Sequence, residues 1–190
     1  MRTRDSGMPE EEVWATFFQP EELLQHLGLT NECRDVVEFG CGYGTFTVPA
    51  AKIVRGTVYA LDIERAMIAT TKRKAEHAGL NNIVARQCDF LEGDLEILNG
   101  SADYVMLFNI LHAEHPELLL SRAYQLLRSQ GTLAIMHWNY DPSTPRGPRM
   151  EIRPRPEQCR DWATGAGFEL RPPGIVDLPP FHYGMALRKV

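Results

Sequence analysis

Residues 35–44 read Asp35-Val36-Val37-Glu38-Phe39-Gly40-Cys41-Gly42-Tyr43-Gly44, a short β-branched run that breaks into three glycines at alternate positions. The run predicts a buried strand, and the glycines predict a tight turn at its end. Because glycine has no Cβ, the backbone N–H groups of such a turn can lie close to a ligand. This stretch therefore indicates a strand that leads directly into a ligand-binding turn.

The spacing of the glycines distinguishes between nucleotide ligands. A dinucleotide fingerprint needs glycines at its first, third and sixth positions, and the sixth position here is Thr45. The third glycine instead comes one place early, at Gly44, and an acid, Glu38, stands two residues before Gly40. This pattern resembles motif I of the class I S-adenosylmethionine-dependent methyltransferases, acid-x-Gly-x-Gly-x-Gly. A tight turn that binds no ligand is the alternative interpretation.

The composition fits one globular domain and narrows the class of partner. The chain has 190 residues, 44% of them hydrophobic, so it can bury a sizeable core. Its formal net charge of -5 argues against a protein that coats nucleic acid or an anionic membrane. No stretch approaches the roughly 20 apolar residues that span a bilayer. We expect a cytoplasmic protein that binds a small molecule, with no nucleic acid or membrane partner; its oligomeric state is not predicted.

The cysteines predict neither a zinc site nor a disulfide framework. The four are widely separated, and no two form a Cys-x-x-Cys pair. We therefore expect free thiols and no bound metal.

Short apolar runs alternate with amphipathic segments from residue 35 onward, which is typical of an α/β fold with a mostly parallel sheet. The expected parallel strands are 35–39, 57–62, 83–87, 102–108 and 132–138. The expected crossover helices are 64–78 and 117–127. Two final strand-like runs, 168–176 and 181–188, are joined by only four residues, which implies an antiparallel pair.

The prediction is therefore a Rossmann-like, doubly wound sheet of seven strands, mostly parallel, with a C-terminal antiparallel hairpin and helices on both faces. Class I methyltransferases have the same topology, so the resemblance covers residues 35–188. Two short helices are expected before it, over 10–18 and 20–27. In this family such a segment often lies over the cofactor. We divide the single domain into an N-terminal helical cap, residues 1–30, and a methyltransferase domain, residues 31–190.

The strand ends carry polar residues in the order that the resemblance implies for S-adenosylmethionine. Ligands of open α/β sheets bind outside the carboxyl ends of the strands. The resemblance implies that Glu38 attracts the methionyl ammonium, that Asp62 binds the ribose hydroxyls and that Asp89 binds the adenine amino group. Helix capping is the alternative role for Asp62, and a surface turn is the alternative for Asp89. The expected cofactor-binding residues are Glu38, Gly40, Cys41, Gly42, Gly44, Asp62, Ile63, Asp89, Phe90 and Asn109.

Two of these residues take their roles from the resemblance alone. It implies that Phe90 lies along the adenine ring and that the backbone carbonyl of Asn109 approaches the ammonium. The segment that begins at Asn109 lacks the Asn-Pro-Pro-aromatic motif. Amines of DNA bases and glutamine amides are therefore disfavoured as acceptors.

The acceptor side has weaker signals. We expect His112 and His137, near the ends of strands four and five, to line the catalytic site, and we assign neither a role in proton transfer. A structural histidine is the alternative for each. Arg146 and Arg149 lie in a proline-rich segment, residues 139–156, whose four arginines suit an anionic acceptor. A solvated loop whose arginines bond local groups is the alternative.

These observations predict an S-adenosylmethionine-dependent methyltransferase that transfers a methyl group to a small acceptor by in-line displacement. The arginines of residues 139–156 favour an anionic acceptor. One alternative is a non-catalytic protein that binds the cofactor as a sensor or partner subunit. A remote alternative is a nicotinamide-dependent oxidoreductase. Single-domain reductases of that kind carry a Tyr-x-x-x-Lys pair, and none of the six tyrosines has lysine four residues on.

Overall fold

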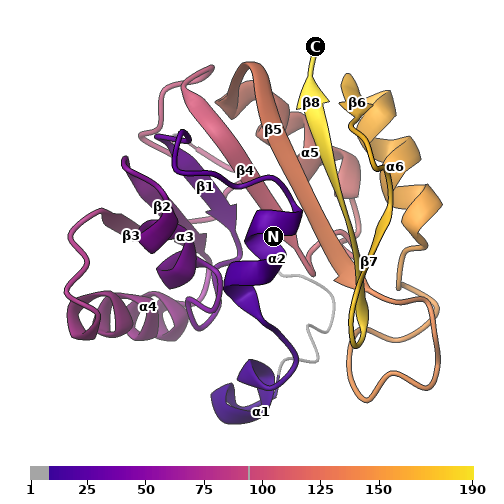
Figure 1. Cartoon of the computed structure of the whole chain (residues 1–190), viewed down its shortest axis with the longest axis horizontal. Coiled ribbons are helices and arrows are strands. Elements are labelled where there is room, and N and C mark those ends of the chain that lie inside the picture. Colours follow the sequence, from indigo (N-terminus) through magenta and orange to yellow (C-terminus); the bar gives the residue numbers. More distant parts are fainter. Residues whose placement is uncertain (1–8, 94) are drawn as a thin grey trace.

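One twisted sheet runs through the centre of the molecule, with helices on both faces (Figure 1). The structure is a computed structural model in which residues 9–93 and 95–190 are described. The strands are β1 Val36–Phe39, β2 Val58–Asp62, β3 Ile83–Gln87, β4 Ala102–Phe108, β5 Leu127–Trp138, β6 Phe168–Leu170, β7 Val176–Leu178 and β8 His182–Lys189. The helices are α1 Glu11–Ala15, α2 Pro20–His26, α3 Thr47–Ile53, α4 Arg65–His77, α5 Pro116–Leu126 and α6 Pro156–Gly165.

The order of the strands reverses at β1. The sheet runs β3-β2-β1-β4-β5-β8-β6, and β7 also pairs with β8. Strands β1 to β5 are parallel, whereas β8 is antiparallel to β5, β6 and β7. The chain leaves β1 toward β3 and returns to β4 on the other side of β1, so the loops after β1 and β4 diverge. The predicted Rossmann-like fold class is confirmed, with eight strands in place of seven.

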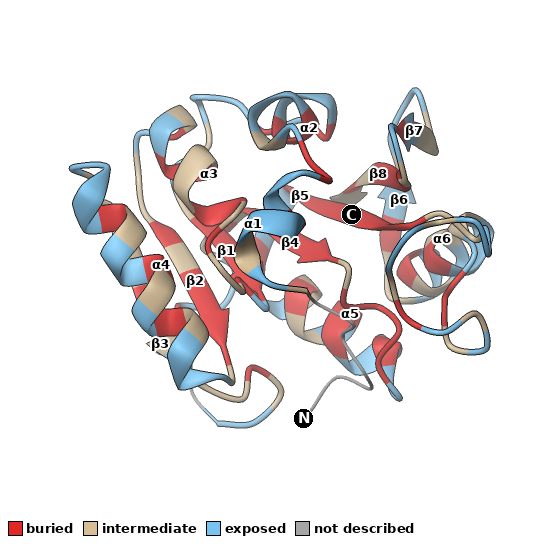
Figure 2. Ribbon diagram, turned by 90° about the horizontal axis from the view of Figure 1, so that it is seen from below, coloured by how far each residue is buried: buried red, intermediate tan, exposed pale blue. Residues whose placement is uncertain are grey.

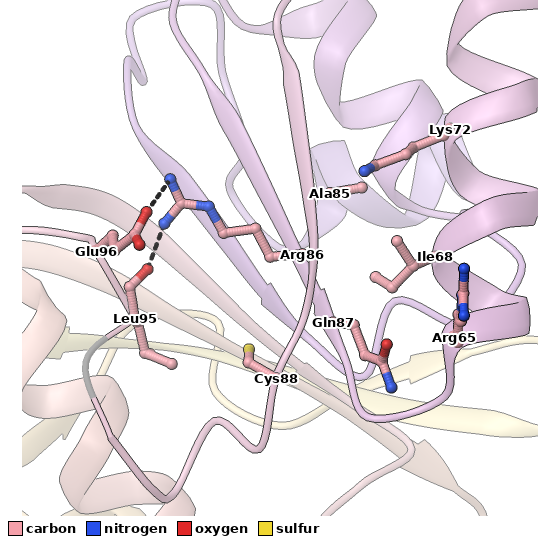
Figure 3. A pocket seen from close by; sticks show the side chains of 9 residues that line it. All are labelled: Arg65, Ile68, Lys72, Ala85, Arg86, Gln87, Cys88, Leu95 and Glu96. Atoms are coloured by element: carbon pink, nitrogen blue, oxygen red, sulfur yellow. Dashed lines mark hydrogen bonds and ion pairs between the residues drawn. The ribbon is translucent and has the colours of Figure 1, made fainter.

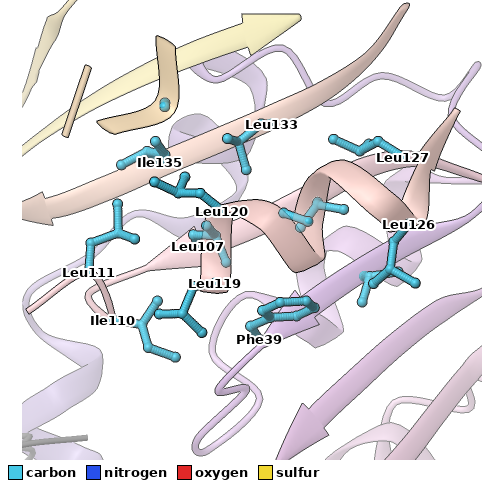
Figure 4. Close-up of a cluster of buried hydrophobic side chains, with 14 of the residues drawn as sticks. Phe39, Leu107, Ile110, Leu111, Leu119, Leu120, Leu126, Leu127, Leu133 and Ile135 are labelled. Atoms are coloured by element: carbon cyan, nitrogen blue, oxygen red, sulfur yellow. The ribbon is translucent and has the colours of Figure 1, made fainter. Parts of the chain in front are cut away.

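Strand residues alternate between two apolar layers. On β4, Val105 and Leu107 pack against α5 and its neighbours, whereas Tyr104 and Met106 belong to the layer that includes α2 and α3. Figure 4 shows leucines of α5 packed over β4 and β5, and Figure 2 shows that the strands are buried while the outer helix faces are exposed. Each fully buried leucine stabilises the fold by about 1.5–3 kcal/mol relative to an exposed one. This burial on both faces fixes the strand ends rigidly.

The expected strand over 168–176 is wrong, because two short strands replace it. Leu170 lies opposite Leu187, and Val176 lies opposite Gly184. Five residues, 171–175, therefore stand against two residues of β8. The inserted segment includes two prolines, which have no N–H to donate to a strand ladder.

Two helices were not predicted. In α3, Pro49 lies in the first turn, where a missing N–H costs no helical hydrogen bond. Helix α6 begins at Pro156, where the proline-rich segment was expected to continue as a loop. Its start is fixed by Gln158, whose Oε1 accepts a hydrogen bond from the N–H of Arg155 at 2.8 Å. Each helix has a proline in its first turn, and in the sequence such a proline can be interpreted as a residue that prevents a helix.

The two predicted N-terminal helices are present, as α1 and α2. Both views place α1 over the carboxyl ends of β1 and β4 (Figures 1 and 2). The Tyr43 hydroxyl donates to the carbonyl of Pro9 at 3.1 Å, and Lys74 Nζ on α4 lies 2.5 Å from Glu11 Oε1 on α1. The division into a cap over 1–30 and a domain over 31–190 stays a prediction, and residues 1–8 lie outside the described part of the chain.

All four cysteines are free thiols in the structure. Within the described ranges, no three or more His, Cys, Asp or Glu side chains gather as a metal site would require. No helix in those ranges combines the length and the apolar character needed to cross a bilayer.

Candidate functional site

The turn after β1 holds its three glycines in the left-handed region. Their φ angles are 73° at Gly40, 52° at Gly42 and 72° at Gly44, a conformation that other residues rarely adopt. A Cβ on Gly44 would lie 3.0 Å from Oγ1 of Thr71 on α4. The same Oγ1 donates a hydrogen bond to the carbonyl of Gly42 at 3.1 Å. Backbone conformation and close packing against α4 therefore both require glycine here.

Asp62 ends β2 and holds the glycine turn. Its Oδ2 accepts a hydrogen bond from the N–H of Gly42, and its Oδ1 accepts one from the N–H of Glu64, each at 2.9 Å. Burial raises the pKa of Asp62, against the lowering effect of these backbone bonds, and the charge of Glu64 raises it further. Asp62 thus makes the capping contact considered as its alternative role. Each oxygen retains a lone pair that could accept from a ligand hydroxyl.

Glu38 is a buried carboxyl group next to Asp62. It accepts a short hydrogen bond from the Thr47 hydroxyl. Burial raises the pKa of Glu38 from 4.5 to about 8; the Thr47 bond lowers it, and the charge of Asp62 adds to the rise. Burial and the same two carboxylates raise the pKa of the Cys41 thiol, which stays protonated. Neither carboxyl group forms an ion pair with a described lysine or arginine. The pair therefore suits a positively charged ligand group.

The loop after β3 contains Asp89 and Phe90, which were predicted to bind the adenine, and their side chains make different kinds of contact. Asp89 Oδ1 accepts a hydrogen bond from the N–H of Leu91 at 3.1 Å, which forms a local turn. Phe90 is 5% exposed and stacks on Phe39, with ring centroids 5.0 Å apart. Its side chain thus packs in the core beneath the strand ends. The apolar side chain of Ile63, which follows Asp62, is half-buried.

Asn109 ends β4 in a left-handed conformation, with φ 53°. Its N–H donates to the carbonyl of Met136 at 2.8 Å, and its buried Oδ1 has no hydrogen-bond partner among the described residues. Its Nδ2 lies 3.5 Å from Nε2 of His182. Burial, followed by the charge of Arg153, lowers the pKa of His182 to about 3. Strained backbone and an unbonded polar atom are typical of functional sites.

Sequence reasoning missed His182. It lies on β8, opposite Trp138 at the end of β5, and the two rings are 4.3 Å apart. Only the antiparallel register of β8 brings it to the carboxyl edge of the sheet. The strand prediction over 181–188 contained the residue but not its register.

His112 and His137, the two histidines predicted to line the catalytic site, lie together. Nδ1 of His112 is 3.2 Å from Nε2 of His137, and the two side chains are 4% and 0% exposed. Burial, then the neighbouring His112 and His182, lowers the pKa of His137 well below its ordinary value. Both side chains are therefore buried on the α5 side of the sheet, and burial keeps the imidazole of His137 neutral.

The segment from 139 to 155 is organised around Arg153. This guanidinium is 7% exposed, and burial lowers its pKa. It donates hydrogen bonds of 2.8–3.2 Å to backbone carbonyls of the loop. The acceptors are Asn139, Asp141, Arg146 and Pro148. The local-bonding alternative thus holds for Arg153. Arg146 and Arg149 are exposed residues of the same segment.

Comparisons with known proteins agree with this architecture. The family described as "Methyltransferase domain" matches residues 36–131. A crystal structure of an S-adenosylmethionine-dependent methyltransferase from Aquifex aeolicus has a TM-score of 0.82 and 21% identity, covering 95% of this chain and 94% of that one. At this identity the likeness shows the fold.

Curated relatives match over part of their length. Ribosomal protein L11 methyltransferase of Acinetobacter baylyi is 32% identical over 117 residues, which are 59% of this chain and 37% of that protein. Nocamycin O-methyltransferase of Saccharothrix syringae is 31% identical over 150 residues, 75% of this chain and 45% of that protein. The chain spans about a third to a half of the length of the curated relatives it matches.

Proposed function

The chain belongs to the S-adenosylmethionine-dependent methyltransferases, and from this premise we propose that it transfers the methyl group of that cofactor to a small acceptor. The observation that carries the proposal is the buried pair of Glu38 and Asp62 beside three left-handed glycines, at the point where the strand order reverses. Ligands of open α/β sheets bind at such a reversal.

The residues present fit S-adenosylmethionine. Glu38 is buried and without a cationic partner in the described chain, so it keeps its proton in the free protein; it would release that proton when the methionyl ammonium binds beside it, because a nearby positive charge lowers the pKa of a carboxyl group. The glycine turn, including Cys41, would pass along the amino acid part of the cofactor. Asp62 would accept from the ribose hydroxyls through its remaining lone pairs, next to Ile63.

The adenine end of the cofactor would lie between the loops after β2 and β3. Asp89 is the candidate acceptor for the adenine amino group. Because Phe90 is buried and stacked on Phe39, we propose that Phe90 supports this end of the cofactor from within the core. The backbone carbonyl of Asn109 would face the ammonium, held by the bond from the Asn109 N–H to Met136.

Bound S-adenosylmethionine supplies a methyl group on a positively charged sulfur. The residues of the chain then have to align the acceptor and exclude water. Helix α1, tied to the turn through Tyr43 and to α4 through Lys74, would restrict water at the carboxyl edge. We propose that His112 and His137 line the acceptor side, and that His137 does so in neutral form, because burial opposes the imidazolium that a general base must become.

The acceptor proposal rests on the loop after β5. Arg153 bonds to the loop carbonyls and orders the backbone, and Arg146 and Arg149 are both exposed to solvent on this loop. Such groups bind carboxylate or phosphate. We therefore propose a small anionic acceptor in the cytoplasm.

Two other functions are distinguishable by experiment. A non-catalytic domain would bind the cofactor without turnover, and a nicotinamide oxidoreductase would prefer NAD. The test incubates the chain with methyl-labelled cofactor and a panel of small carboxylates, phosphates and neutral alcohols. Label transfer to an anion is the expected result. Transfer only to neutral acceptors would contradict the anionic specificity, and cofactor binding with no transfer to any member would favour the sensor.

A further inference from the structure

A groove of about 480 Å³ lies along the outer edge of the sheet, at β3 (Figure 3). One side is formed by Arg65, Ile68 and Lys72 of α4, and the floor includes Ala85 and Gln87 of β3. Figure 3 shows the side chains of α4 directed toward β3. The groove is separate from the glycine turn and from the loop after β5, so the proposed methyl transfer does not use it.

The floor of the groove is an unpaired strand edge. Strand β3 is the last strand of the sheet on this side and pairs with β2. Asn82 and Cys88 bond to β2 through their backbone groups. Because backbone direction alternates along a strand, Ile83, Ala85 and Gln87 direct their N–H and C=O groups outward. Ile83 is half-buried and Gln87 is exposed, whereas Ala85 is buried, so another extended chain would complete hydrogen bonds at Ile83 and Gln87 first and would have to displace the side chains that cover Ala85.

The charge of the groove is positive on an acidic protein. Arg65 and Lys72 form no ion pair with a described residue. Arg86 and Glu96 also line the groove; Arg86 donates to the carbonyl of Leu95 at 2.6 Å and pairs with Glu96 at 3.0 Å. The lining thus has three cationic side chains and one carboxylate, and because Glu96 pairs with Arg86, Arg65 and Lys72 have no ion-pair partner in the described chain, although the whole chain carries a net charge of -5.

We propose that this groove binds an extended acidic segment of a partner protein, which adds to β3 as a further strand. Seven residues of helix separate Arg65 from Lys72 by about 10 Å. An extended chain rises about 3.3 Å per residue, so acidic side chains two to four residues apart on one face reach both cations.

Two other occupants fit less well. A second copy of this chain would place like charges against each other, because β3 would bring its own Arg65 and Lys72 to the interface. Single-stranded nucleic acid would find two unpaired cations and a row of backbone groups that pair best with another backbone. A peptide strand uses both features.

The site also lies next to the proposed adenine end. Nε2 of Gln87 donates to the carbonyl of Ile63 at 3.1 Å, so the last floor residue of the groove holds the turn after Asp62. A partner strand on β3 would therefore contact the support of the cofactor site.

The test uses fluorescence anisotropy with a labelled nine-residue peptide of alternating threonine and glutamate. The intact chain should bind it, and an alternating threonine and lysine peptide should not bind. Arg65→Glu with Lys72→Glu should weaken binding at least tenfold. The matched variant, Arg55→Glu with Arg73→Glu, makes the same change in net charge outside the groove and should bind within about twofold of the intact chain.

Amide hydrogen exchange gives a second readout that charge attraction alone would not produce. With the acidic peptide bound, exchange should slow at the N–H groups of Ile83, Ala85 and Gln87. No binding of the peptide, equal loss in both double variants, or binding without this protection would overturn the proposal. Tighter binding of a nine-nucleotide single-stranded DNA than of the acidic peptide would overturn it in favour of nucleic acid.

Discussion

Asp62 and Asp103 each accept hydrogen bonds from two backbone N–H groups, at opposite edges of the same sheet. At the carboxyl edge, Asp62 accepts from Gly42 and Glu64. At the amino edge, Asp103 accepts from Arg34 and Asp35, at 2.7 and 3.1 Å. Each aspartate thus holds two backbone N–H groups in place at its edge of the sheet.

Their electrostatic surroundings differ. Burial would raise the pKa of Asp103, but its hydrogen bond to Arg128, the two backbone bonds and the Arg128 charge lower it overall. Burial raises the pKa of Asp62, and its neighbour Glu38 is another buried carboxyl group. Asp103 thus has a cationic partner in Arg128, whereas neither Asp62 nor Glu38 forms an ion pair with a described residue. The comparison indicates that Asp103 is a structural carboxylate, whereas Asp62 and Glu38 form a pair that suits a cationic ligand.

The largest expected effect is on the pH dependence of stability. The pKa of Glu38 rises from 4.5 to about 8 in the folded chain, so the folded state keeps a proton that the unfolded state releases. The free energy of unfolding should therefore fall by about 1.4 kcal/mol per pH unit between these values. Glu38→Gln should remove this slope, which amounts to about 4 kcal/mol from pH 5 to 8. Urea unfolding at several pH values measures it.

Asp103→Asn is the matched control, with the opposite sign. Because the folded pKa of Asp103 is lowered, its ion stabilises the fold above the unfolded pKa, and this contribution is lost as the pH falls through the folded value. Asp103→Asn should therefore destabilise the chain at pH 7 and have no effect in acid. Parallel slopes for Glu38→Gln and the intact chain would contradict the burial argument.

The next effect is on cofactor affinity. Asp62→Ala should weaken binding of S-adenosylmethionine by on the order of 2 to 4 kcal/mol, because two hydrogen bonds to a charged acceptor are lost. Asp103→Ala removes a carboxylate with the same number of backbone partners and should leave affinity within about twofold. Both variants should lose stability, since each leaves two N–H groups without an acceptor. Equal affinities for the two variants would reduce Asp62 to a cap.

A smaller effect is expected in the loop after β5. Replacing Arg146 and Arg149 together by alanine should leave cofactor affinity unchanged and lower methyl-transfer efficiency by about tenfold or more, if a bidentate anion contact is lost. Arg160→Ala with Arg171→Ala, two arginines outside the loop, is the control. A parallel loss of cofactor affinity would assign the loop to the cofactor, and no change would leave it a solvated loop.

The sequence predicted the features that depend on local pattern. The β-branched run before Gly40, the acids that end strands and the alternation of elements are all local, and they led to the correct fold. The prediction from local pattern was wrong at residues 171–175. Two prolines interrupt the apolar run there, and the segment forms an insertion between β6 and β7, which both pair with β8. Helix α6 was missed because Pro156 marks a helix start as readily as a loop.

Side-chain roles that depend on tertiary contacts were harder to predict. Nothing near Phe90 in sequence indicates that it stacks on Phe39, 51 positions earlier. His182 reaches the carboxyl edge through strand register alone. Arg153 resembles the other loop arginines in sequence, yet it binds four backbone carbonyls, and only the fold of the loop determines which arginine is buried.

The central claim is that the carboxyl edge binds S-adenosylmethionine, and calorimetric titration of the chain tests it most directly. The account predicts one site that binds S-adenosylmethionine and its demethylated product, with NAD much weaker. Absence of heat with S-adenosylmethionine, or tighter binding of NAD, would contradict the account.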